Sequence, residues 1–102
     1  MRELFHPNIE QINLSAVLNA LGDPTRLRII KNLSDKKETT CGYCNIDLPK
    51  SALSHHFKVL RESGLIKVRI EGKQRFLSIR FEELEQKFPG LLESVIKSIY
   101  LG

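Results

Sequence analysis

The chain has 102 residues, 41% of them hydrophobic and 27% charged, which is enough for one compact domain and too few for two. This composition excludes a disordered or collagen-like chain, and no apolar run approaches the ~18 residues that a bilayer span needs. The formal net charge of +4 is concentrated: residues 50–80 hold eight basic and two acidic side chains, and the other 71 residues hold eight basic and ten acidic ones. We therefore expect a cytoplasmic protein with a polyanionic partner, nucleic acid rather than a membrane.

Two helices are predicted in the N-terminal third of the chain. Apolar residues at helical spacing predict the first over residues 9–21. Asp23 and Pro24 start the second, because the aspartate can accept bonds from free N–H groups and proline has no N–H to lose. Polar residues 34–40 indicate a loop, and residues 41–48 support at most a turn or two of helix. The outward side of the second helix is basic, with Arg26, Arg28 and Lys31.

Residues 50–62 predict the most regular helix of the chain. At 100° per residue, one side of this helix is apolar throughout and the other is polar. The polar side consists of Lys50, Ser51, Ser54, His55, Lys58, Arg61 and Glu62. His56 falls on the apolar side, where a hydrogen-bonded core histidine is the simplest role.

A β-hairpin is predicted over residues 66–80, where alternating residues flank a turn that contains Gly72. Because the apolar residues of its first strand alternate with Lys67 and Arg69, we interpret its outward row as basic. From Phe81 the pattern is helical again, is interrupted at residues 89–90, and ends in an apolar stripe that runs almost to the C-terminus.

This order of elements predicts a mainly α fold with a small β-hairpin, the winged helix-turn-helix, as a single domain over residues 1–102. A helix fits the ~12 Å major groove, and a ribbon with cations at its tip can reach the adjacent backbone. We expect Ser51, Ser54 and His55 to contact bases and Lys50, Lys58 and Arg61 to hold phosphates. Arg69, Lys73 and Arg75 of the wing are then positioning contacts.

Two segments also resemble a known family. LNALGDPTRLRII (residues 18–30) and SALSHHFKVLRESGLI (residues 51–66) are similar to the ArsR/SmtB type of bacterial winged-helix transcriptional regulators. The resemblance covers about residues 15–81. It implies a homodimer in which the first and last helices pair, and a repressor that leaves its operator when an effector binds. It also implies that the helix over residues 50–62 is the recognition helix.

The terminal stripes are more apolar than a lone domain of this size readily covers, so self-association is expected from the residues as well. Part of each stripe must also serve the chain's own core. The candidate dimer residues are Ile12, Val17, Leu18, Leu92, Val95, Ile96 and Ile99. Such a dimer would present two recognition helices to a pseudo-palindromic double-stranded DNA operator.

Cys41 and Cys44 are a separate question. In metal-responsive members of this family, thiolates commonly form a Cys-x-Cys pair before the recognition helix, or carboxylate and His ligands lie on the last helix. This chain has Cys-Gly-Tyr-Cys and no His or Cys in residues 81–102, so it departs from both patterns. Structural cysteines, a metal site completed from elsewhere and a redox-active pair remain open, and no cofactor is required.

Enzyme motifs are missing from the sequence, including a nucleophile elbow and a phosphate-binding glycine loop, so we expect no enzyme. The main alternative to a DNA-binding regulator is a winged helix that serves as a protein-interaction module. Such a module would not need the charge of residues 50–80, and its binding would depend little on salt.

Overall fold

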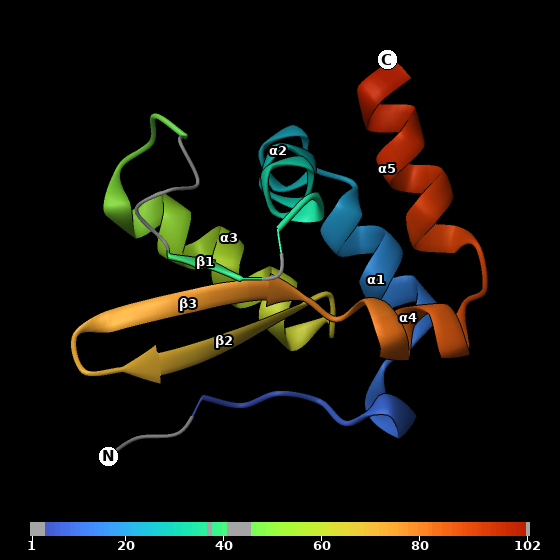
Figure 1. Cartoon of the computed structure of the whole chain (residues 1–102), viewed down its shortest axis with the longest axis horizontal. Helices are drawn as coiled ribbons and strands as arrows, with labels where there is room; N and C mark the ends of the chain where they lie inside the picture. Colours follow the sequence, from blue (N-terminus) through green and yellow to red (C-terminus); the bar gives the residue numbers. More distant parts are fainter. Residues whose placement is uncertain (1–3, 37, 41–45, 102) are drawn as a thin grey trace.

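The computed structural model of the chain describes residues 4–36, 38–40 and 46–101. A short 3-10 helix, η1 (Ile9–Gln11), precedes helices α1 (Leu14–Leu21) and α2 (Pro24–Ser34) and strand β1 (Thr39–Thr40). Helix α3 (Lys50–Glu62), strands β2 (Ile66–Glu71) and β3 (Gln74–Ile79) and helices α4 (Phe81–Lys87) and α5 (Leu91–Leu101) follow. The predicted class, mainly α with a small β-hairpin, is confirmed (Figure 1).

The first predicted helix is interrupted in the structure. Asn8 caps η1, and the backbone turns extended at Ile12 before Asn13 caps α1 by accepting a 2.9 Å hydrogen bond from the Ala16 N–H. Two asparagines that each satisfy free N–H groups thus replace one continuous helix by two. The break leaves Ile12 only 1% exposed, beneath the end of α3.

The start of α2 agrees with the prediction from Asp23 and Pro24. The Asp23 carboxylate accepts a 3.0 Å hydrogen bond from the Arg26 N–H, which lowers the pKa of Asp23, and Pro24 occupies the first turn. α2 then supplies the fully buried Ile29, Ile30 and Leu33 to the core.

The loop predicted for residues 34–40 is wrong at its end. Thr39 and Thr40 form β1, which pairs antiparallel with Leu77 and Phe76 of β3. β-branched threonines suit a strand, and the free edge of β3 offers backbone partners that no local pattern reveals. The sheet therefore has three strands in the order β1-β3-β2.

The hairpin itself has the predicted form. Glu71 of β2 pairs with Gln74 of β3 across a two-residue turn, and Gly72 in that turn has φ +61°. α3 packs against β2, while α5 lies beside α2 and α4 at the other end of the molecule (Figure 1).

Gly64 fixes the passage from α3 into β2. Its φ of +92° lies in the left-handed region, and a Cβ there would be 2.5 Å from Cγ1 of Ile12. The Leu65 N–H bonds back to the Leu60 carbonyl at 3.0 Å, as in a helix end closed by glycine. Only glycine satisfies both the backbone angle and the close contact.

Three candidate dimer residues belong to the chain's own core, which corrects that part of the prediction. Ile12 and Val17 are 1% exposed and Leu92 is 4% exposed, because they face the interior between the helices. Leu18 is 48% exposed, and Val95, Ile96 and Ile99 are half-buried. Within the described part of the chain, no helix is long and apolar enough to cross a membrane.

Candidate nucleic-acid interface

The outer face of α3 presents polar side chains to solvent. The helix follows Pro49 and extends from Lys50 to Glu62, as predicted, with its apolar side turned to the core and Leu60 fully buried. The exposed residues of the predicted contact set are Lys50, Ser51, Ser54, His55 and Lys58. Hydroxyl and imidazole groups can donate to and accept from base edges, and the ammonium groups suit phosphates.

Arg61 departs from this set. It is 9% exposed, and its Nη1 donates a 2.8 Å hydrogen bond to the carbonyl of Phe5. Helical spacing placed Arg61 on the polar side, but the N-terminal segment lies against the end of α3 and covers it. Its burial and this hydrogen bond argue against the predicted role as a phosphate contact. No sequence signal marks a backbone carbonyl 56 residues away as the partner.

The two faces of the hairpin carry different arginines. Directly paired residues share a face of an antiparallel sheet, so Arg75 lies beside Ile70 on the face that also carries Val68 and Leu77, towards α3. Arg69 pairs with Phe76 on the opposite face. Two of the predicted wing contacts, Arg69 and Arg75, thus lie on different surfaces.

Arg69 is also occupied by contacts within the chain. Its Nε and Nη2 donate to Glu38 at 3.1 and 2.9 Å, and its Nη1 donates to Glu71 at 2.6 Å. These hydrogen bonds raise the pKa of the Arg69 guanidinium, which stands 4.4 Å from the centroid of the Phe76 ring. Arg69 lies on the face of the hairpin opposite Arg75 and is bonded to two carboxylates. Both observations argue against its predicted role as a wing contact.

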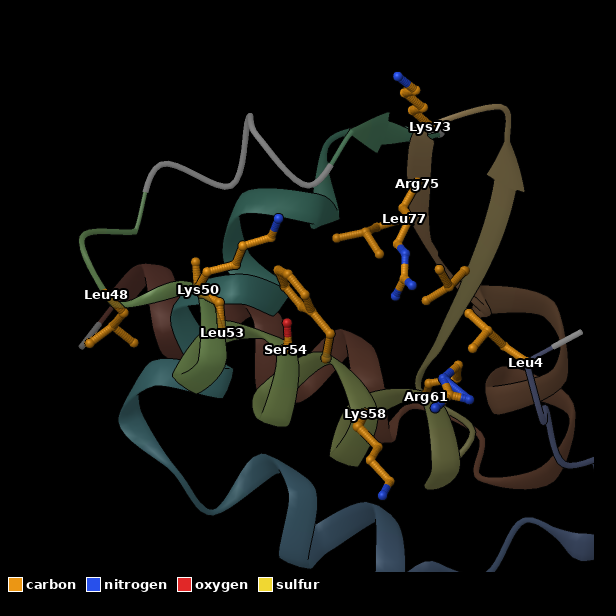
Figure 2. Close-up of a pocket in the computed structure, with 12 residues that line it drawn as sticks. Leu4, Leu48, Lys50, Leu53, Ser54, Lys58, Arg61, Lys73, Arg75 and Leu77 are labelled. Carbon is orange, nitrogen blue, oxygen red and sulfur yellow. The ribbon is translucent and has the colours of Figure 1, made fainter. Parts of the chain in front are cut away.

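Four cations remain available on the face formed by α3 and the hairpin. Lys50, Lys58, Lys73 and Arg75 have no ion-pair partner among the described residues. In Figure 2, Lys50 and Arg75 extend into the space between α3 and β3, whereas Lys73 points away from it at the tip of the hairpin. The arrangement places positive charge on both sides of a groove.

A polar cluster fixes α3 against the α1–α2 junction. The Arg26 guanidinium donates to the Ala20 carbonyl at 2.6 Å and lies 3.3 Å from Nδ1 of His56. Arginine has no acceptor, so Nδ1 of His56 accepts, and the ring proton is on Nε2. Asp23 lies 3.9 Å from the same ring nitrogen. His56 is thus a half-buried, hydrogen-bonded support as predicted, and Arg26 turns inward instead of facing a partner.

Cys41 and Cys44 belong to the segment 41–45, which lies outside the described residues. The three interpretations of this pair therefore stay open. Elsewhere in the described chain, no group of three or more His, Cys, Asp or Glu side chains is placed to hold a metal ion.

Comparisons with known proteins agree on one family. A family model described as "Bacterial regulatory protein, arsR family" matches residues 23–68. The chain is 38% identical over 84 residues to the uncharacterized HTH-type transcriptional regulator YceK of Bacillus subtilis strain 168, covering 78% of this chain and 82% of that protein.

Two solved structures share the fold. HlyU from Vibrio cholerae N16961 superposes with a TM-score of 0.69 at 27% identity, covering 86% of this chain and 91% of that one. The transcriptional repressor BigR from Xylella fastidiosa gives a TM-score of 0.65 at 28% identity, covering 82% and 83% of the two chains. The chain is thus similar to these proteins both in sequence and in architecture.

Proposed function

The chain belongs to the ArsR family of bacterial regulatory proteins and is a DNA-binding transcriptional regulator, and we propose that it is a homodimeric repressor that an effector releases from a pseudo-palindromic operator. The four available cations of α3 and the hairpin, defined above, contact the phosphates. Ser51, Ser54 and His55 contact the bases. The function requires no cofactor. It is supported best by one observation, the exposed polar face of α3 beside a hairpin whose Lys73 and Arg75 carry no paired carboxylate among the described residues.

Salt dependence tests the DNA contact. Genomic fragments retained by the purified protein supply the duplex, and fluorescence anisotropy measures its affinity from low to high salt. Four phosphate contacts per protomer, or eight per dimer, predict a slope of log K against log salt of roughly −7. A slope near zero would favour the protein-interaction module and contradict the proposal.

Base contacts and phosphate contacts are separable by substitution. We expect His55→Ala to reduce the preference for the retained duplex over a scrambled one, by about 1 to 3 kcal/mol if the imidazole reads a base edge. Lys73→Ala, the matched control, should weaken binding to both duplexes equally and reduce the salt slope by about 1 per protomer. Equal loss of discrimination in both variants would contradict the assigned roles.

Self-association is supported by the apolar surface that the fold leaves uncovered. Leu14 and Leu18 of α1 are 46% and 48% exposed, and the half-buried Val95, Ile96 and Ile99 follow one side of α5. Leu14 is not among the predicted dimer residues. The continuous helix predicted over residues 9–21 gave no reason to expect the Leu14 side chain on the surface. We assign the interface to these five residues, without Ile12, Val17 and Leu92.

Leu18→Glu tests this interface. Burying a carboxylate at each copy of α1 should convert the dimer into a monomer in sedimentation velocity experiments, with the circular dichroism of the fold retained. Asn19→Glu adds the same charge at the next position of α1, which is also exposed, and should leave the dimer intact. A dimer that persists in Leu18→Glu would move the interface elsewhere.

A further inference from the structure

A groove of about 580 Å³ lies between α3 and the hairpin. Val68 and Leu77 of the sheet form its buried floor, and the half-buried Leu53 and Phe57 of α3 form one wall. Figure 2 shows Leu48, ahead of α3, and Leu4, near the N-terminus, at its two ends. Its volume lies within the range of small-molecule sites, and half of its lining residues are apolar.

The polar side chains around this groove are five cations and one hydroxyl. Lys50, Lys58, Arg61, Arg75 and the Ser54 hydroxyl line it, Lys73 stands at its rim with the side chain directed away, and none of the described lining residues is acidic. Arg61 is occupied by the Phe5 carbonyl, whereas Lys50 and Arg75 extend towards the groove without a carboxylate partner among the described residues. An anion that enters between them would meet two cations and a hydroxyl donor.

DNA contact explains the cations, and the core explains Val68 and Leu77. Leu53 and Phe57 pack against the core yet remain partly exposed to the groove, as does Leu48. A phosphodiester backbone needs charge and hydrogen-bond donors, and it gains nothing from Leu53, Phe57 or Leu48. A ligand that satisfies the whole groove combines an apolar body of several carbons with one anionic head.

We propose that this groove binds a small, soluble amphipathic carboxylate, with the head between Lys50 and Arg75 and the apolar body against Leu53 and Phe57. Bound there, the carboxylate occupies two of the cations assigned to DNA phosphates, so ligand and duplex exclude each other. This regulatory consequence rests on the proposed function, whereas the binding of the carboxylate does not.

Octanoate is the probe, tested first without DNA. Isothermal titration and ¹⁵N chemical shifts of the full chain should show octanoate binding, with shifts at Leu53, Phe57 and Leu77. Octanol keeps the apolar body and acetate keeps the charge, and each should bind at least about tenfold more weakly than octanoate. Equal binding of octanol and octanoate would overturn the proposal.

Matched variants locate the site. Arg75→Gln should weaken octanoate binding roughly tenfold, and Lys73→Gln, two residues away but directed out of the groove, should change it by less than about twofold. Leu48→Asn should weaken octanoate binding while leaving duplex affinity intact. Shifts at Leu27 and Val95 instead would place the ligand in the groove between α2 and α5 and overturn the assignment.

Competition with the retained duplex tests the consequence. Octanoate should lower the apparent duplex affinity of the wild-type protein and should do so much less in Leu48→Asn. If octanoate binds the groove and does not displace the duplex, the proposed mutual exclusion of ligand and DNA is overturned. If octanoate binds but no duplex is ever bound, the proposed function fails and the ligand site is supported.

Discussion

Arg69 and Arg75 stand on the same hairpin, six positions apart, and their surroundings differ completely. Arg69 lies on the face with Phe76 and is held by Glu38 and Glu71. Arg75 lies on the face towards α3 and has no such partner among the described residues. Strand register, rather than the number of basic residues, decides which cation can meet a phosphate.

The same division extends across the basic stretch of residues 50–80. Arg61 is bonded to the Phe5 carbonyl, and the half-buried Arg80 donates to the Pro7 carbonyl at 2.7 Å and to Glu83 at 2.6 Å. These arginines attach the N-terminal segment to α3 and to the end of β3. Three of the eight basic side chains, including Arg69, thus serve the fold, which makes the net charge an overestimate of the DNA-binding surface.

The largest expected effect comes from replacing, one at a time, the two cations near the end of α3, Arg61 and Lys58. Arg61→Met removes the buried donor to the Phe5 carbonyl and should lower the free energy of unfolding by about 2 kcal/mol, measured by urea denaturation. Its salt slope for duplex binding should equal that of the wild type, because Arg61 holds no phosphate.

Lys58→Met is the matched control, three residues earlier and exposed on the same helix. It should leave stability nearly unchanged and reduce the salt slope by about 1 per protomer. If Arg61→Met reduced the slope instead, the distinction between fold-serving and DNA-binding cations would not hold.

A smaller effect is expected from the hairpin pair. Arg75→Gln should weaken duplex binding and reduce the salt slope by about 1 per protomer, since it removes a free cation from the α3 face. Arg69→Gln removes the same charge from the opposite face and should leave the slope unchanged. Anisotropy titrations at several salt concentrations measure both, and equal slopes in the two variants would contradict the assignment from register.

The sequence predicted the elements that local chemistry determines. Asp23 and Pro24 marked the start of α2, and the residues around Gly72 marked the hairpin, because capping and tight turns depend on neighbouring residues. The apolar and polar sides of residues 50–62 placed α3 correctly except for Arg61. These successes all rest on interactions between residues close in the sequence.

Most of the errors involve partners distant in the sequence, and the break between η1 and α1, which the caps of Asn8 and Asn13 produce, is the local exception. β1 exists because Thr39 and Thr40 meet the edge of β3, nearly 40 residues later. Ile12 is buried because Gly64 leaves room for its side chain, so a residue predicted for the dimer became core. The face of Arg69 could have been derived from the two-residue turn, whereas its bond to Glu38 could not.

The smallest expected effect concerns the N-terminal segment, whose carbonyls accept hydrogen bonds from Arg61 and Arg80. His6 lies beside β2, and its Nε2 accepts a 2.9 Å hydrogen bond from the Val68 N–H, so Nδ1 carries the proton and donates to the Leu4 carbonyl at 3.1 Å. Burial lowers the pKa of His6 below its ordinary 6.5, and the charges of Arg61, Arg80 and Lys67 lower it further against the opposing effect of the Leu4 carbonyl. The folded chain therefore favours the neutral ring.

Stability should follow the sign of this shift. Below pH 6.5 the unfolded chain binds the His6 proton more readily than the folded chain, so the free energy of unfolding falls as the pH falls towards the lowered pKa. The carboxylates of Asp23 and Glu38, whose pKa values are lowered, lose most of their contributions below pH 4.5. Urea denaturation between pH 7.5 and 5 should thus record a decline that His6→Gln removes, since glutamine can accept from Val68 without titrating. His55→Gln, on the exposed face of α3, should retain the decline, and its loss there would assign the pH dependence to the recognition helix instead of to the N-terminal segment.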